Sequence, residues 1–210
     1  MKRNQKDDNF QVTKPDEIDL VCFSHLRWNF VYQRPQHLMN RVAKERRVFY
    51  MEEAVIDSGP ARLEVTKDSE RLWVVVPHIP VELSKEDGRA ILTELVDQML
   101  SSHNINQYIA WYYTPMAMGF TYHLKPSLIV YDCMDELSAF DGAHPRLLEY
   151  EQELLNKADL VFTGGVSLYE AKKQRHPNVH AFPSSIELEH FRQARSVTND
   201  PIDQMHIPHP

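Results

Sequence analysis

A chain of 210 residues with 42% hydrophobic content is long enough for one sizeable domain with its own core. Its formal net charge of −7 disfavours general nucleic-acid binding. No apolar run approaches the ~20 residues that a spanning helix requires, and the N-terminus lacks the apolar centre of a secretory signal. We therefore expect a cytoplasmic protein. Cys22 and Cys133 each lie in an apolar run, which favours two buried thiols over a disulfide or a metal site.

The predicted elements alternate between strands and helices, which is typical of a Rossmann-like, doubly wound α/β domain with a parallel sheet. Residues 1–16 lack this pattern and are predicted to be disordered. Strands are expected at 18–23, 48–51, 72–76, 107–111, 128–131, 159–162 and 179–182, and helices that begin near 33, 85, 114, 144 and 167. The first strand is apolar throughout except for Asp19, so we expect a central strand that is covered on both faces.

Two stretches interrupt the alternation. Residues 52–69 are polar and contain Gly59-Pro60, so they are predicted to be irregular, and Pro77 is expected to end the third strand. Residues 192–210 show no periodicity and contain three prolines near their end. We expect this last stretch to be a linker that follows a domain spanning residues 17–191.

Residues 158–191 carry the most informative pattern of the chain. Ala158-Asp159 and an apolar strand precede Gly164-Gly165, a helix that opens at Ser167, a second strand, Pro183-Ser184-Ser185-Ile186-Glu187 and Phe191. A strand–helix–strand unit of this kind predicts parallel pairing. The stretch resembles the end of the first domain of GT-B glycosyltransferases, close to family 4, where Pro-Asn-Gly-Val-Asp precedes a Phe. It departs from that pattern at Ser184-Ser185 and at Glu187.

The resemblance implies one half of a two-domain enzyme. This half would be the acceptor-side domain, without a cofactor, and the nucleotide-sugar donor would bind a C-terminal domain beyond the linker. The implied reaction moves a hexosyl group to a hydroxyl in bacterial-type polysaccharide or lipopolysaccharide biosynthesis, and the isolated domain would be inactive. Two alternatives stay open: a non-catalytic flavodoxin-like binding or scaffold module, and half of a GT-B nucleotide-sugar epimerase.

Polar side chains gather at the ends of the predicted strands, where ligands of open parallel sheets bind. In the first loop, His25 can act as a base, Arg27 and Arg34 can hold phosphate or carboxylate, Trp28 offers a stacking face, and Gln33 can bind hydroxyls. Structural roles stay open: a hydrogen-bonded loop residue for His25, a hydrophobic lid for Trp28 and an ion pair for Arg34. Because inverting enzymes in the resembling family often keep their base in this loop, His25 is the predicted catalytic residue.

Further substrate contacts are expected after the later strands. They are His78, Tyr113, Asp132, Asp135, Glu136 and Gly164. The acidic run 132–136 could hold magnesium, or it could cap the following helix and bind acceptor hydroxyls. We favour the second interpretation and predict no metal site, in agreement with the resemblance. Retaining family 4 enzymes usually carry a glycine pair in the first loop and a histidine after the fourth strand. This chain has neither at those places, so the stereochemical outcome stays open.

The first predicted helix carries a basic face. Its members are Arg41, Lys44, Arg46 and Arg47. A solvated face is the ordinary interpretation, and contact with anionic lipid on the inner face of the membrane is the alternative. The expected partner is a sugar or a lipid-linked glycan acceptor.

Overall fold

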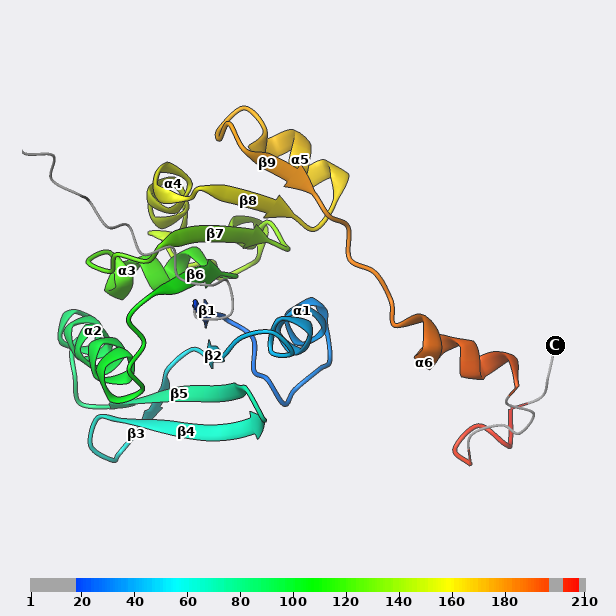
Figure 1. The fold of residues 1–210 in the computed structure, drawn as a ribbon, viewed down its shortest axis with the longest axis horizontal. Helices are drawn as coiled ribbons and strands as arrows, with labels where there is room; N and C mark the ends of the chain where they lie inside the picture. The colour runs from blue at the N-terminus through cyan, green and yellow to red at the C-terminus, as the bar shows by residue number, and fades with distance from the viewer. Residues whose placement is uncertain (1–17, 197–201, 208–210) are drawn as a thin grey trace, which may run out of the picture.

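The computed structural model describes residues 18–196 and 202–207, so the prediction for residues 1–16 lies outside the described residues. Nine strands form one sheet in the order β3-β5-β2-β1-β6-β7-β8-β9, with β4 paired to β5 (Figure 1). Every pairing is parallel except that of β4 with β5. The predicted doubly wound Rossmann-like fold is confirmed. Strand order reverses between β1 and β6, which is where such sheets bind ligands.

The elements lie close to the predicted positions. The strands are β1 (Asp19–Phe23), β2 (Val48–Met51), β3 (Val55–Asp57), β4 (Arg62–Ser69), β5 (Leu72–Pro80), β6 (Tyr108–Tyr112), β7 (Leu128–Cys133), β8 (Leu160–Thr163) and β9 (Val179–Ala181). The helices are α1 (Arg34–Val42), α2 (Lys85–Ser102), α3 (Met118–Thr121), α4 (Leu147–Lys157), α5 (Val166–Lys172) and α6 (Leu188–Arg192), with 3-10 turns at 115–117, 137–139 and 193–195. No described helix is long and apolar enough to span a bilayer.

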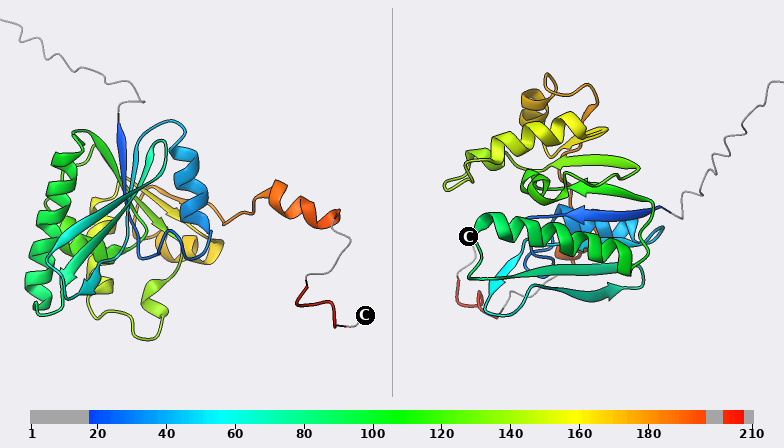
Figure 2. Two further views of the ribbon diagram at one scale, coloured as in Figure 1. Left: turned by 90° about the horizontal axis from the view of Figure 1, so that it is seen from below. Right: turned by 90° about the vertical axis from the view of Figure 1, so that its left-hand side faces the viewer.

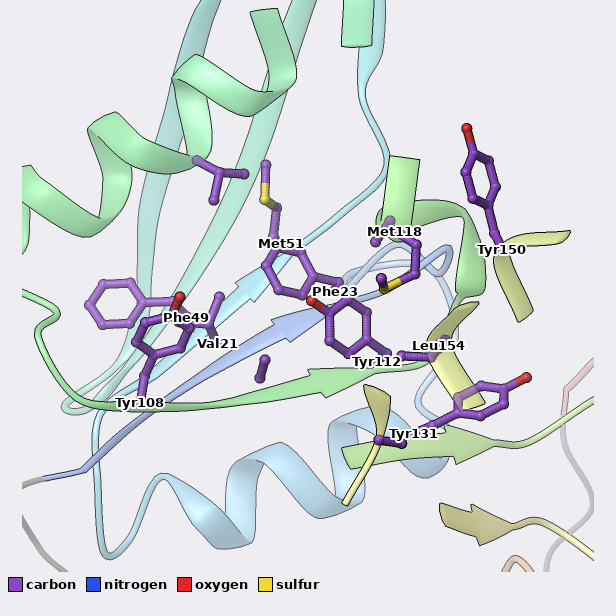
Figure 3. Close-up of a cluster of buried hydrophobic side chains, with 14 of the residues drawn as sticks. Val21, Phe23, Phe49, Met51, Tyr108, Tyr112, Met118, Tyr131, Tyr150 and Leu154 are labelled. Carbon is purple, nitrogen blue, oxygen red and sulfur yellow. The ribbon is translucent and has the colours of Figure 1, made fainter. Parts of the chain in front are cut away.

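Helices cover the two faces of the sheet unequally. Helix α1 lies on one face and α2 on the other (Figure 2). On the α2 side, Val21 and Phe23 of β1 belong to a core that also contains residues of α2 and α4 (Figure 3). On the α1 side, Leu20 and Cys22 join a smaller core with Met39. All five residues of β1 are buried because its alternate side chains enter two different cores.

Two sequence predictions about residues 52–80 are wrong. The stretch predicted to be irregular contains β3 and β4, and β5 continues through Pro77. In β4, half-buried Leu63 and Val65 alternate with exposed residues, as expected for a strand with one solvated face. Pro77 is tolerated because β2 pairs with β5 only as far as Val75 and β3 pairs from His78 onward. Its missing N–H therefore falls between the two parallel partners.

The chain leaves the body of the domain after β9 (Figure 1). Residues 183–196 are all exposed, and within them α6 and the 3-10 turn at 193–195 form elements that the sequence pattern did not predict. Helix α6 has no buried residue. Its two apolar side chains, Leu188 and Phe191, are 59% and 55% exposed, so no described part of the chain packs closely over them.

Candidate functional site

The carboxyl ends of four strands meet at one edge of the sheet. The Tyr113 N–H donates to the Phe23 carbonyl at 2.9 Å, which joins the loops after β6 and β1, and the Gly164 N–H donates to the Cys133 carbonyl at 2.8 Å, which joins those after β8 and β7. The first of these bonds lies at the reversal of strand order. The loops that carry most of the predicted site residues are therefore neighbours.

His25 lies in the loop after β1 and is half-buried. Its Nδ1 atom is buried and has no hydrogen-bond partner among the described residues. Burial lowers the pKa of His25 from 6.5, while the charge of Asp135 and the backbone of Tyr113 act in the opposite direction. The imidazole is therefore neutral at pH 7, which is the form that accepts a proton. A neutral imidazole near a carboxylate meets one requirement of a general base, and the other is that its accepting nitrogen reach the acceptor hydroxyl.

Arg34 and Asp132 form a buried ion pair. The Arg34 Nε atom lies 3.0 and 3.1 Å from the two carboxylate oxygens, and Nη2 lies 2.9 Å from Oδ1. Asp132 is fully buried, which raises its pKa, and Arg34 opposes that rise. The capping interpretation of Asp132 is wrong, because its carboxylate binds Arg34 and the two helical elements that follow have no side-chain cap. For Arg34, the structure shows the structural ion pair that the sequence left open as an alternative to ligand binding.

Arg27 and Trp28 of the first loop contact the end of β2 and β4, whereas Phe30 in the same loop is 80% exposed. Arg27 pairs with Glu52 at 2.8 Å, and the other carboxylate oxygen of Glu52 accepts the Trp28 N–H at 2.7 Å. The indole N–H of Trp28 donates to Asp68 at 2.9 Å, and its ring is 6% exposed and packs on Tyr50. Trp28 is therefore a packed lid over the α1-side core, which matches the structural alternative.

Other predicted contacts lie apart from His25. His78 Nδ1 lies 2.7 Å from Asp57 at the β3 edge of the sheet, and Glu136 pairs with Lys172 at 2.8 Å. Gln33 lies just before α1, where its N–H donates to the side chain of Gln36 at 3.0 Å. Each of these side chains has a structural partner.

Gly164 and Tyr113 complete the predicted set. A Cβ atom on Gly164 would lie 2.8 Å from the carbonyl oxygen of Met134, so glycine permits the close approach of the loops after β8 and β7. Tyr113 is buried, and its hydroxyl has no hydrogen-bond partner among the described residues. The part of the chain that the structure describes contains no group of three or more His, Cys, Asp or Glu residues that could hold a metal ion.

The sequence did not predict a cavity of about 400 Å³ on the α2 side of the same edge. It extends from Ser24, the residue before His25, to the first turns of α2. Its apolar lining includes Phe23, Met51, Ile79, Leu92, Met116 and Phe120, and its polar lining includes Glu53, Lys85, Arg89 and His144. The lining residues come from many separated segments of the chain, so the cavity could not be predicted from the sequence.

The strand order and the ligand edge define a Rossmann-like α/β domain that matches one half of the GT-B glycosyltransferase fold. The chain is similar to a sucrose-phosphate synthase from Thermosynechococcus elongatus (TM-score 0.58, 11% identity, 82% of this chain and 49% of that one). It is also similar to an α,α-trehalose-phosphate synthase (UDP-forming) from Burkholderia xenovorans in complex with glucose-6-phosphate (TM-score 0.56, 11% identity, 89% and 54%).

The third similar structure is "Trehalose-6-phosphate from E. coli bound with UDP-2-fluoro glucose". Its TM-score is 0.57 at 12% identity, over 91% of this chain and 52% of that one. The chain thus spans about half the length of these three proteins. At such low identity the likeness shows the fold. No protein-family model matches the sequence, and no curated protein matches it.

Proposed function

We propose that the chain is the acceptor-side domain of a glycosyltransferase that moves a sugar from a nucleotide-sugar to a hydroxyl. The fold of one GT-B half supports the class of enzyme. The observation that carries the proposal is His25, a neutral imidazole whose buried Nδ1 is unpaired at the reversal of strand order. A base at that place can act on an acceptor held by this domain.

In the proposed reaction, the acceptor oxygen forms a bond to the anomeric carbon as the bond to the nucleoside diphosphate breaks. His25 takes the hydroxyl proton, and the charge of Asp135 stabilises the resulting imidazolium. The pair of Arg34 and Asp132 ties the start of α1 to β7 and thereby holds the loop that carries His25. Since the sequence has no glycine-rich phosphate motif, the donor phosphates are assigned to a second domain.

We assign the acceptor to bacterial-type polysaccharide or lipopolysaccharide biosynthesis on the cytoplasmic side of a membrane. Basic side chains near α1 could face anionic lipid, but three of the four have internal bonds, including Arg46, which donates to the carbonyl of Ile18 at 3.3 Å. Arg47 pairs with Asp19, and Arg41 donates to the carbonyl of His37 at 2.7 Å. The cavity beside α2 is therefore the better-supported route to a lipid-linked acceptor.

The proposal is tested by comparing this chain alone with a protein in which it is joined to a donor-side domain. Release of nucleoside diphosphate is measured with a panel of nucleotide-sugars and hydroxyl acceptors. We expect turnover by the joined protein and none by the chain alone. Transfer by the chain alone, or a joined protein that binds nucleotide-sugars and transfers to none of the acceptors, would contradict the proposal.

A further inference from the structure

The cavity beside α2 has walls that suit an apolar ligand. Most of its lining side chains are apolar, and they come from both the sheet and α2. Two of them, Ile56 and Val81, are 68% and 59% exposed, so the apolar lining continues to the surface. A bare sugar offers hydroxyls on every side and would leave them unpaired against such walls. The cavity therefore fits a ligand with a hydrocarbon part.

Several polar side chains of the cavity already have partners. Both carboxylate oxygens of Glu52 are occupied, one by Arg27 and one by the Trp28 N–H. The Ser84 hydroxyl is bonded to Asp87, whose N–H it accepts at 3.1 Å. These groups close the rim of the cavity, and their existing bonds leave them little capacity for a ligand.

Most of the remaining charged side chains in the cavity lining are cationic. Lys85 and Arg89 form no ion pair with any described residue, and they lie one turn apart at the start of α2, with Leu92 following on the same side. Among the described residues, the carboxylate of Glu53 has no hydrogen-bond or ion-pair partner, and Arg27 donates to the Glu53 carbonyl at 2.7 Å and partly offsets its charge. The local balance therefore favours an anionic ligand.

The side-chain stem of Arg89 packs against the neighbouring helical segment α3. Arg89 is half-buried, and its Cδ atom would lie 3.5 Å from a Cβ added at Gly119, beside the ring of Tyr150. A guanidinium group is well suited to bind phosphate with its fixed set of donors. Because Arg89 lines an open cavity, an anionic ligand in that cavity could bind its guanidinium group.

We propose that this cavity binds an acceptor carried on a lipid phosphate, with the hydrocarbon chain against the apolar walls and the phosphate on Arg89 and Lys85. The inference rests on the proposed function, whose acceptor class it specifies. The cavity reaches Ser24, so a sugar attached to the phosphate would lie toward His25. Arg89 would then be a residue that determines specificity for lipid-linked acceptors.

The test is calorimetric titration of the purified chain with decyl phosphate below its micelle-forming concentration. Decyl glucoside, which has the same chain without the anion, and inorganic phosphate, which has the anion without the chain, are titrated in parallel. The variants are Arg89→Gln and Arg89→Lys, with Lys125→Gln and Arg41→Gln as controls. Lys125 is an exposed cation before β7, at the opposite edge of the sheet, and Arg41 belongs to α1. Thermal melting checks that each variant is folded.

We expect one decyl phosphate to bind per chain, with at least tenfold weaker binding for Arg89→Gln because a charge-assisted hydrogen bond is lost. Arg89→Lys should retain more affinity than Arg89→Gln, the two control variants should bind within twofold of the wild type, and both partial ligands should bind more weakly. Equal binding by folded Arg89→Gln, a loss that follows Arg41→Gln instead, or no saturable binding would overturn the inference. Because binding requires no turnover, transfer to soluble acceptors without decyl phosphate binding would sink the inference and leave the proposed function intact.

Discussion

Arg34 and Asp132 are 98 positions apart in the sequence and form a bidentate, buried ion pair between the start of α1 and the end of β7. Their side chains are 9% and 0% exposed. Arg34 also donates to the carbonyl of Phe182, just after β9. One guanidinium thus joins three segments at the edge of the sheet where the candidate site lies.

Loss of that guanidinium should destabilise the fold strongly. Arg34→Gln leaves the buried Asp132 carboxylate without its cation, and we expect unfolding free energy to fall by about 3–5 kcal/mol. The pKa of Asp132 is already raised by burial, and loss of Arg34 should raise it further. A carboxyl whose folded pKa exceeds its unfolded pKa contributes less stability as pH rises. The variant should therefore be more stable at pH 5 than at pH 7.

Chemical denaturation at both pH values measures this effect. Arg146→Gln is the matched control, because Arg146 makes a similar two-bond contact with Glu149 on the surface. We expect its denaturation midpoint to stay near that of the wild type. Similar losses in the two variants would show that burial of the Arg34 pair is unimportant.

Gly164 should be sensitive to a single added methyl group. In Gly164→Ala the new Cβ would meet the carbonyl oxygen of Met134 at 2.8 Å, which forces the loops after β7 and β8 apart. We expect a loss of about 1–3 kcal/mol by analogy with overpacking. The adjacent Gly165→Ala is the control, since its Cβ would meet nothing within 4 Å and should cost less than about 1 kcal/mol. Equal melting points for the two variants would contradict the close approach.

Asp135 should set the acidic limb of the pH–rate profile. If His25 is the base, kcat/KM rises with pH as the imidazolium loses its proton, and that pKa lies below 6.5 because of burial. Asp135 raises the pKa of His25, so Asp135→Asn should move the limb to lower pH. Asp141→Asn, an exposed change in the same connection, should leave it in place. A limb that stays fixed or moves to higher pH in Asp135→Asn would rule out this coupling.

The central sheet could be predicted from the sequence because buried parallel strands are continuous apolar runs, as in Leu20 to Phe23. Strand β4 escaped prediction because it alternates half-buried and exposed residues beside a Gly-Pro turn and pairs only with β5. A proline interrupts β5 at a point that only the pairing of β2 and β3 explains. Local pattern therefore identified the covered strands and the edge strand β9, and missed β3 and β4 at the other edge.

The candidate site was predictable in location and only partly in roles. Loops at strand ends indicated the edge where the carboxyl ends of the strands meet, and His25 lies there with a buried Nδ1 that has no hydrogen-bond partner among the described residues. The partner of Asp132 could not be inferred, since contact between residues 98 positions apart depends on how α1 packs against the sheet. The cavity that contains Arg89 was missed for the same reason, because its walls come from many separated segments.

The most direct test of the account is turnover of His25→Ala in the joined protein, together with its melting temperature. Loss of a general base costs about 10²–10⁴-fold in rate, or about 3–5 kcal/mol of barrier. Because, among the residues that the structure describes, Nδ1 of His25 makes no hydrogen bond and the imidazole interacts with only one backbone group, that of Tyr113, the melting temperature should change little. His123→Ala is the control. His123 lies before β7, at the opposite edge of the sheet, and its side chain contacts Asp97.

We predict a drop in turnover of at least 100-fold for folded His25→Ala, at an unchanged melting temperature, and wild-type turnover per folded molecule for His123→Ala. The contrary result is a lowered melting temperature for His25→Ala with turnover within a few-fold of the wild type. That result would assign His25 a structural role in its loop and remove the base from the proposed reaction.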